Sequence, residues 1–150
     1  MKTIIAEIQS RLVGNSNIKY VDENWGQLDY YSPNFPVKWP CVLIDIADAR
    51  FSDIGRDNSK VPAARQIGSL VIELRIANLR LTNTSGQAPR LQQLQARSIH
   101  DLIEEVHATL HDWSPVDHCT KLVRQSQTRV KRDDGVQEYA VRYSLENHNC

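Results

Sequence analysis

The run Cys41-Val42-Leu43-Ile44-Asp45-Ile46 gives the clearest indication of a strand in this sequence. Its nearly continuous apolar character predicts a strand that is buried on both faces at its start. A second strand is predicted over 69–81, because the side chains there alternate between two faces. One face carries Leu70, Ile72, Leu74 and Ile76, and the other carries Val71, Glu73 and Arg75.

The residues between these two strands, 48–68, predict a long polar connection that contains Gly55, Asn58 and Pro62. Connections of this length are uncommon in compact domains and are usually functional or disordered. We therefore expect a loop here. Within it, we expect 51–65 to be mobile and to be cut first in limited proteolysis.

Two helices are predicted, one before and one after this pair of strands. The first covers 2–13, where apolar residues recur at helical spacing and Gly14 suits the end of the helix. The second covers about 90–112 and has one continuous apolar stripe. That stripe is formed by Leu91, Leu94, Ile99, Leu102, Ile103, Val106 and Leu110. A short strand over 18–21 is also indicated.

The C-terminal residues predict a hairpin with strands over 120–131 and 136–145 and a turn at Asp133-Asp134-Gly135. The second strand has an apolar face, formed by Tyr139, Val141, Tyr143 and Leu145. The first strand is polar on both faces and locally basic. Arg124 and Arg129 are therefore candidate interface residues, and a plain solvated edge strand is the alternative.

These elements predict a single α+β domain over 1–150, with two helices packed on an antiparallel or mixed sheet of about four strands. The expected order is α-β-β-α-β-β.

Eighteen basic residues balance eighteen acidic ones, which argues against a general nucleic-acid binder. No apolar run is long enough to span a bilayer, and no signal-peptide core follows Met1. Three cysteines without a CxxC pair predict a protein that folds in a reducing cytoplasm.

The stretch 22–40 is unusual because it combines three prolines with five aromatic residues. Prolines this frequent oppose a helix, so we expect an extended arm or loop. Its aromatic residues, Trp25, Tyr30, Tyr31, Phe35 and Trp39, are candidates for a subunit interface, where aromatic side chains bury a large area. Packing of the arm onto its own domain is the alternative.

No catalytic or cofactor motif is found. His107 and His111 have the spacing of a zinc-binding helix, but Ala108 stands where the metalloprotease motif needs glutamate. Cys41 lies in a hydrophobic strand, where cysteines are usually inert. We expect no enzyme, no metal and no cofactor. Two alternatives stay open: a small metal-dependent enzyme that uses the histidines of the long helix, and a monomeric adaptor that presents the aromatic arm to a partner.

The order of elements resembles that of the tail-terminator or tail-completion proteins of long-tailed bacteriophages. The resemblance rests on the strand pair Trp39–Ile46 and Leu70–Ile76 with its long polar loop, and on the closing strand Glu138-Tyr139-Ala140-Val141-Arg142-Tyr143. It implies a structural protein that forms a ring, most often a hexamer, which closes the tail tube and joins it to the head connector. It also implies assembly in the host cytoplasm, a final place in the virion tail, and tail-tube and connector proteins as partners.

Overall fold

The computed structural model describes residues 1–29, 37–79, 98–132 and 136–148. The described chain forms two α-helices, one short 3-10 helix and five strands. The helices are α1 (Lys2–Val13), η1 (Gln27–Asp29) and α3 (Ser98–Leu110). The strands are β1 (Tyr20–Glu23), β2 (Cys41–Arg56), β3 (Ala64–Leu79), β4 (Val123–Val130) and β5 (Val136–His148). The predicted α+β class and order are confirmed, and the indicated short strand joins the sheet as β1.

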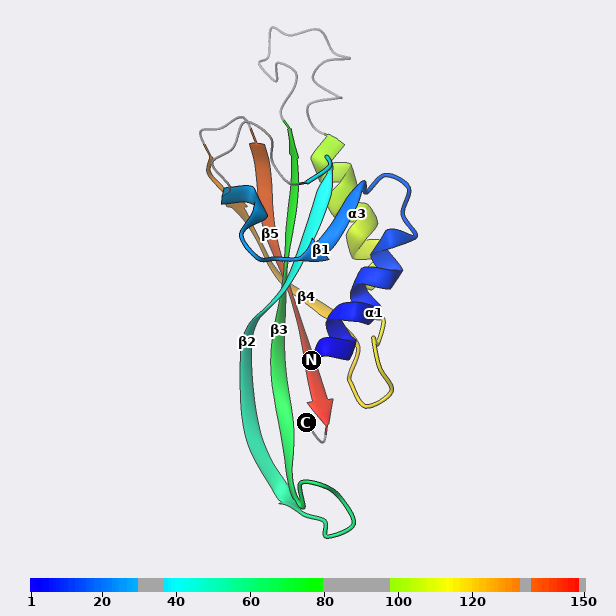
Figure 1. The fold of residues 1–150 in the computed structure, drawn as a ribbon, viewed down its shortest axis with the longest axis vertical. Coiled ribbons are helices and arrows are strands. Elements are labelled where there is room, and N and C mark those ends of the chain that lie inside the picture. The colour runs from blue at the N-terminus through cyan, green and yellow to red at the C-terminus, as the bar shows by residue number, and fades with distance from the viewer. Residues whose placement is uncertain (30–36, 80–97, 133–135, 149–150) are drawn as a thin grey trace, which may run out of the picture.

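All five strands belong to one sheet, with the order β1-β2-β3-β5-β4 (Figure 1). β1 runs parallel to β2, and every other neighbouring pair is antiparallel, so the sheet is mixed. The edges of this sheet are β1 and β4. Because neighbouring strands pair in a defined register, residues can be matched row by row from one edge strand to the other.

One face of the sheet packs against α1 and α3, which lie beside its upper half in Figure 1. The helices contribute residues spaced three or four apart, and the strands contribute every second residue. The main core cluster includes Ile4, Ile8, Leu12, Val42, Ile44, Leu70, Ile72, Leu74, Ile76, Ile99, Ile103, Val106, Val141, Tyr143 and Leu145. Burying one such side chain fully stabilises the fold by roughly 1.5–3 kcal/mol. This face holds most of the apolar core.

The opposite face carries a smaller apolar cluster, formed by Leu28, Cys41, Leu43, Ala77 and Val136. The segment around η1 crosses this face and covers the cluster. β2 is therefore buried on both faces over Cys41–Ile44, where no residue is more than 1% exposed. This confirms the prediction for the start of that strand.

The predicted long loop over 48–68 is wrong, because most of it is strand. β2 and β3 continue to pair as far as Arg56 and Ala64, which leaves a connection of only 57–63. We call residues 48–68 the ribbon. It projects beyond the helices in Figure 1. Beyond Ala49, every ribbon residue of β2 is exposed, so this strand lacks the alternation of apolar and polar residues that marks a half-buried strand.

The backbone of the ribbon carries two irregularities. The register of β2 against β3 shifts between Ile46 and Asp48, and again between Asp53 and Gly55. Gly55 has a φ of +115°, which side chains other than glycine rarely adopt. In the connection, the Asp57 backbone N–H donates to the Ala63 carbonyl at 2.8 Å. This bond closes the end of the ribbon.

The second helix and the C-terminal hairpin differ from the prediction at their ends. α3 ends at Leu110 because Asp112 adopts a left-handed conformation with a φ of 62°. The predicted helical residues 90–97 and the predicted turn 133–135 lie outside the described residues. β5 extends past Leu145 to His148 because the ribbon side of β3 pairs with it. In the described parts of the chain, neither helix is long and apolar enough to cross a membrane.

Candidate interaction surfaces

The predicted aromatic arm is divided between the fold and the solvent. Trp39 is half-buried and packs against the small cluster on the face opposite the helices. Trp25 lies between β1 and η1 and is 59% exposed. Tyr30, Tyr31 and Phe35 lie outside the described residues. The expectation of an extended segment is wrong at 27–29, which forms η1, because the prolines begin only after it.

Buried polar contacts hold the segment around η1 against the sheet. The Gln27 side chain is fully buried and donates to the Glu23 carbonyl at 2.9 Å. Its oxygen accepts from the Trp25 backbone N–H at 2.9 Å. The Arg132 guanidinium donates to the carbonyl of Leu28, which connects this segment to the end of the β4 strand. Trp25 is therefore presented on a fixed turn.

A network of ion pairs lies next to this segment, on the sheet face opposite the helices. Glu73 binds Arg75 at 2.6 Å and Arg142 at 2.9 Å. Glu138 binds Arg75 at 2.6 Å and Arg132 at 3.0 Å. The side chains of Glu73 and Glu138 are only 8% and 3% exposed, whereas Arg142 is 51% exposed. The network therefore extends from Arg132, which binds the η1 segment, to the exposed side chain of Arg142.

The surrounding arginines keep the buried Glu73 carboxylate charged. Burial by itself would raise the pKa of Glu73, but hydrogen bonds and charge from Arg75 and Arg142 outweigh it, so the pKa is lowered. Burial likewise acts to lower the pKa of Arg75, and its bonds to Glu73 and Glu138 raise the pKa above the ordinary value. Removing Glu73 or Glu138 would take an ion-pair partner from two arginines at once, which is destabilising where the arginine is mostly buried.

β4 is an exposed edge strand, and no other described strand pairs with its outer side. Nearly all of its residues are exposed, as the polar sequence predicts. The Arg124 backbone N–H donates to His111 Nδ1 at 3.3 Å, and its guanidinium lies 3.7 Å from Glu104. Arg129 is exposed and makes no ion pair with another described residue. The two candidate arginines therefore differ, because Arg124 is partly buried beside Glu104 and Arg129 is exposed.

The histidines of α3 lie near Arg124. The rings of His107 and His111 are 4.6 Å apart, and His107 Nδ1 lies 3.4 Å from the hydroxyl oxygen of Tyr143. Burial lowers the pKa of His107, as do the charges of Arg124 and His111. Among the described residues, no three His, Cys, Asp or Glu side chains gather as metal ligands would.

Burial, with the nearby Glu138 carboxylate, raises the pKa of the Cys41 thiol to about 12.

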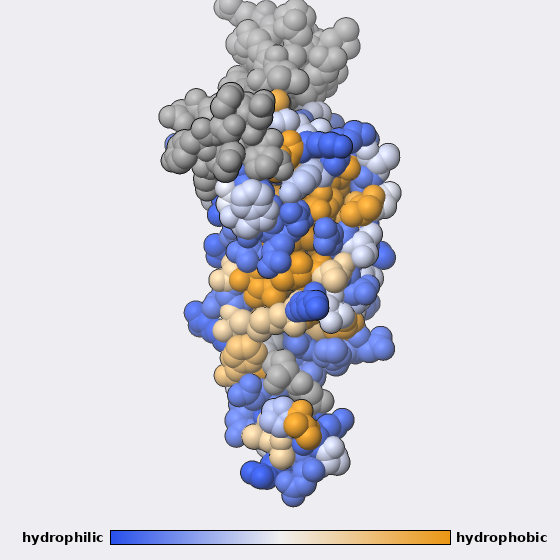
Figure 2. All heavy atoms as spheres, in the orientation of Figure 1, coloured by the Kyte–Doolittle hydropathy of each residue, from blue (hydrophilic) through white to orange (hydrophobic). Residues whose placement is uncertain are grey.

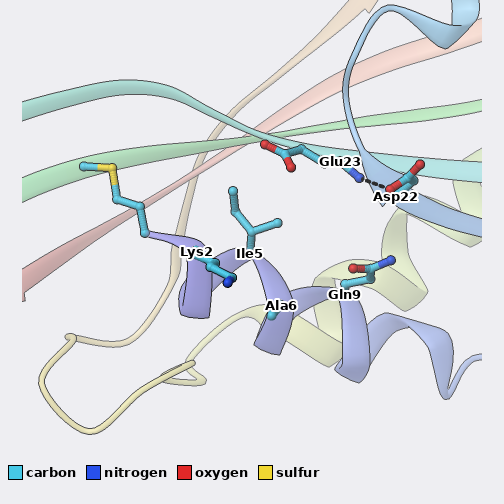
Figure 3. A pocket seen from close by; sticks show the side chains of 7 residues that line it. Lys2, Ile5, Ala6, Gln9, Asp22 and Glu23 are labelled. Carbon is cyan, nitrogen blue, oxygen red and sulfur yellow. Dashed lines mark hydrogen bonds between the residues drawn. The ribbon is translucent and has the colours of Figure 1, made fainter.

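A groove of about 450 Å³ lies at the other edge of the sheet, between α1 and β1 (Figure 3). It is lined by Met1, Lys2, Ile5, Ala6, Gln9, Asp22 and Glu23. The Gln9 amide donates to the Val21 carbonyl at 2.9 Å, which ties α1 to this edge. Asp22 accepts from the Tyr20 hydroxyl at 2.9 Å. Glu23 is exposed and makes no ion pair with another described residue. The β1 edge is thus acidic.

The ribbon carries exposed apolar side chains. Phe51 is 46% exposed, Ile54 is 43% exposed and Val61 is fully exposed. In Figure 2, polar side chains cover most of the ribbon and apolar ones appear there in small groups. Scattered apolar residues are normal on a protein surface.

Three of the charged residues that shape these surfaces were not predicted as site residues from the sequence: Glu23, Glu73 and Glu138. Glu73 and Arg75 alternate with apolar residues in one strand, and this spacing indicates a charged face. The sequence could not show that Glu138 faces the same pair, because this depends on the register between β3 and β5. Glu23 was placed in the aromatic arm, which hid its position at a sheet edge.

Comparison with known proteins identifies the fold. No family model matches the chain, and no curated protein matches its sequence. A solved structure described as the virion of a native gene transfer agent particle contains a chain of similar fold, with a TM-score of 0.52. The two chains share 10% sequence identity, and the match covers 96% of this chain and 93% of the other. At this identity the match establishes a shared fold.

Proposed function

We propose that this chain is a structural subunit of a phage-like virion. The observation that carries the proposal is the similarity of fold, over nearly the whole of both chains, to a component of a gene transfer agent particle. Within the virion, we propose the role that the sequence resemblance implies, which is a ring that closes the tail tube and joins it to the head connector. The chain would act through subunit contacts and without catalysis.

The surfaces of the domain support a ring. A ring subunit needs two different surfaces that match each other, because its contacts run head to tail around the axis. The sheet offers two such surfaces, since its β1 edge is acidic and its β4 edge carries Arg124 and Arg129. The projecting ribbon is a third surface, separate from both edges. It suits contact with the tail tube or the head connector.

The proposal includes a hexamer as the ring, tail-tube and head-connector proteins as partners, and the virion tail as the final location after assembly in the host cytoplasm. Light scattering with the purified chain over a wide range of concentration tests the ring. We expect a mass that is a multiple of 17.2 kDa, either for the chain alone or after addition of purified tail tubes. A chain that stays monomeric in both conditions contradicts the proposal.

A further inference from the structure

The edge of the sheet beside α1 changes character where β1 ends. Along β1 the outward carbonyls are occupied, because those of Val21 and Glu23 accept from the side chains of Gln9 and Gln27. Beyond β1, β2 continues into the ribbon (Figure 1), and no described strand pairs with its outer side there. The open part of this edge therefore belongs to the ribbon and not to β1.

The backbone groups along β2 point alternately toward β3 and outward. The Ile44 carbonyl accepts from the Asn24 N–H at 2.8 Å, so the backbone groups of Ile44 point outward. The extra residue Ala47 then shifts the alternation by one residue. Ala49 and Phe51 therefore point their N–H and carbonyl groups outward, and no described residue forms a hydrogen bond with them.

The outer edge of β4 is open in the same way. The Arg124 N–H donates to His111 Nδ1 and not to β5, so the backbone groups of Arg124 point outward. The register shift at Gln125 again moves the alternation by one residue. Gln127 and Arg129 therefore point their backbone groups outward, and no described residue forms a hydrogen bond with those groups.

The two open edges match in direction and in face. β2 and β4 run in opposite directions, because three antiparallel pairings separate them. Ala49 lies in the row of Leu70, and Gln127 lies in the row of Val141, and both partners belong to the main core. β4 of a second copy can therefore continue the sheet beside the ribbon, with the helices of both copies on one face.

One register joins the free backbone groups of both edges. It sets Ala49 opposite Arg129 and Phe51 opposite Gln127, as two hydrogen-bonded pairs that each exchange N–H and carbonyl bonds. The Phe51 side chain is 46% exposed in the single chain. In this register it lies beside Gln127 and one diagonal step from Arg129, which is within reach of aromatic and long side chains.

The charges at the two ends of this pairing are complementary. At one end, the next outward residues on the two strands are Asp53 and Arg124. At the other end, Lys131 follows β4 and lies near Glu23, at the end of β1. The acidic β1 edge thus contributes charge to the contact, although its backbone is occupied.

The offset between the two copies fits a closed sheet. Within one chain, Gln127 is level with Leu74, whereas Phe51 is level with Gly68, six residues away along β3. At roughly 3.4 Å per residue, the second copy is displaced by roughly 20 Å along the strands. Four strands spaced roughly 4.8 Å apart span roughly 19 Å, so this displacement corresponds to a strand tilt of roughly 45°. Strands in closed sheets tilt by roughly 35–45°, so repetition of the contact favours a ring.

We infer that the ribbon part of β2 in one copy binds β4 of a second copy as an antiparallel pair, with Ala49 opposite Arg129 and Phe51 opposite Gln127. This inference rests on the proposed ring and names the two surfaces that its head-to-tail contact uses. The occupant is a second copy of this chain, because its β4 matches the ribbon edge in direction, in outward backbone groups and in charge. The tip of the ribbon, 57–63, stays free for contacts outside the ring.

A disulfide tests the register. Ser52→Cys with Ser126→Cys, in a chain that also carries Cys150→Ser, places two thiols directly opposite each other in a pair that is not hydrogen-bonded. Cα atoms in such a pair are roughly 4.5 Å apart, within the range that a disulfide spans. Oxidation should therefore crosslink neighbouring copies. Ser52→Cys with Gln127→Cys is the matched control and should crosslink roughly tenfold less, because directly successive side chains of a strand point to opposite faces.

A proline tests the backbone pairing. Ala49→Pro removes an outward N–H and places the proline ring where the second strand would lie, while the N–H groups that bond β3 remain. The concentration needed for assembly should rise by roughly tenfold or more, since hydrogen bonds at every contact are lost. Ala49→Val is the matched control, because it keeps the N–H, and it should change that concentration by less than about twofold. Circular dichroism checks that both variants fold.

The outcomes separate this inference from the proposed function. Crosslinks in the 52–126 pair but not in the 52–127 pair, with weaker assembly of Ala49→Pro, support the edge pairing. If the unmodified chain forms rings, the edge pairing is wrong when the 52–126 pair stays uncrosslinked or when Ala49→Pro assembles normally, and the ring proposal stands. If Ala49→Pro does not fold, the crosslink alone decides. If the unmodified chain is monomeric with and without tail tubes, both are wrong.

Discussion

The two halves of the β2–β3 hairpin belong to the same two strands but are held in different ways. In the covered half, Cys41–Ile44 are buried on both faces, under helices on one side and under the η1 segment on the other. In the ribbon, nearly every residue of β2 is exposed and the pairing with β3 continues without a core. Tertiary burial therefore stabilises one half, and backbone pairing with turn chemistry holds the other. The strands of this sheet therefore extend well beyond the residues that the hydrophobic core buries.

The largest effect should come from a charge placed in the covered half. Val141 is fully buried at the centre of the main cluster. Val141→Asp should cost about 4 kcal/mol or more of unfolding free energy, because the carboxylate would be buried without a partner. Urea unfolding followed by circular dichroism measures the loss. Val123→Asp is the control, since Val123 is 50% exposed on β4, and an equal loss there would contradict the assignment of the core.

A smaller loss is expected from the ion-pair network. Glu138→Ala removes the carboxylate that binds Arg75 and Arg132. The expected loss is about 3 kcal/mol, because Arg75 and Arg132 each lose an ion-pair partner in a mostly buried network. Glu146→Ala on the same strand is the matched control, since its side chain is exposed. Equal unfolding midpoints for the two variants would show that the network adds nothing to stability.

A weaker effect should appear as a pH dependence. The pKa of Glu73 is lowered from 4.5 in the fold, so the unfolded chain binds a proton at higher pH than the folded chain does. The stability from Glu73 is therefore complete above about pH 4.5 and is lost as the pH falls through the lowered pKa. The pKa of Asp57 on the ribbon is also lowered, mainly by hydrogen bonds from Ser59.

Glu73→Gln and Asp57→Asn separate these two carboxylates. We expect Glu73→Gln to flatten the acid-side loss of stability, measured as the urea midpoint from pH 6 to pH 3. Asp57→Asn should change it much less, because Asp57 is only half-buried and its interactions are screened by solvent. The opposite ranking would place the acid-sensitive contact in the ribbon.

The smallest effect on stability is expected in the ribbon itself. Phe51→Ser should change the unfolding free energy by less than about 0.5 kcal/mol, as surface substitutions usually do. Limited proteolysis should first cut within 57–63, where the strands end, and should spare the paired residues 48–56. A first cut within 48–56 would show that the ribbon strands open in solution.

The fold was largely predictable because burial leaves a periodic trace in the sequence. Ile4, Ile8 and Leu12 indicate α1, and Leu70 to Ile76 indicate the covered half of β3. The ribbon left no such trace, since its strands are paired but exposed. The polar character of β4 around Arg124 and Arg129 was also evident. The position of Glu23 on a sheet edge was not evident, because it depends on the pairing of β1 with β2, which lies about twenty residues later and which no local pattern encodes.

The extra residue at the junction of the two halves has a consequence for how the ribbon tolerates insertions and deletions. Between the row of Ile46 and the row of Asp48, β2 contains Ala47, which has no partner in β3. Even-numbered residues of β2 face the helices before it, and odd-numbered residues such as Ala49 and Phe51 do so after it. A bulge of this kind bends a strand and increases its twist. Deleting Ala47 should therefore straighten the ribbon and keep every side chain on its present face. Deleting one residue between Asp48 and Asp53 would instead turn the side chains on one side of the deletion to the opposite face of the sheet. The direction in which the ribbon points is thus encoded by one alanine and can change in evolution independently of the surface that the ribbon presents.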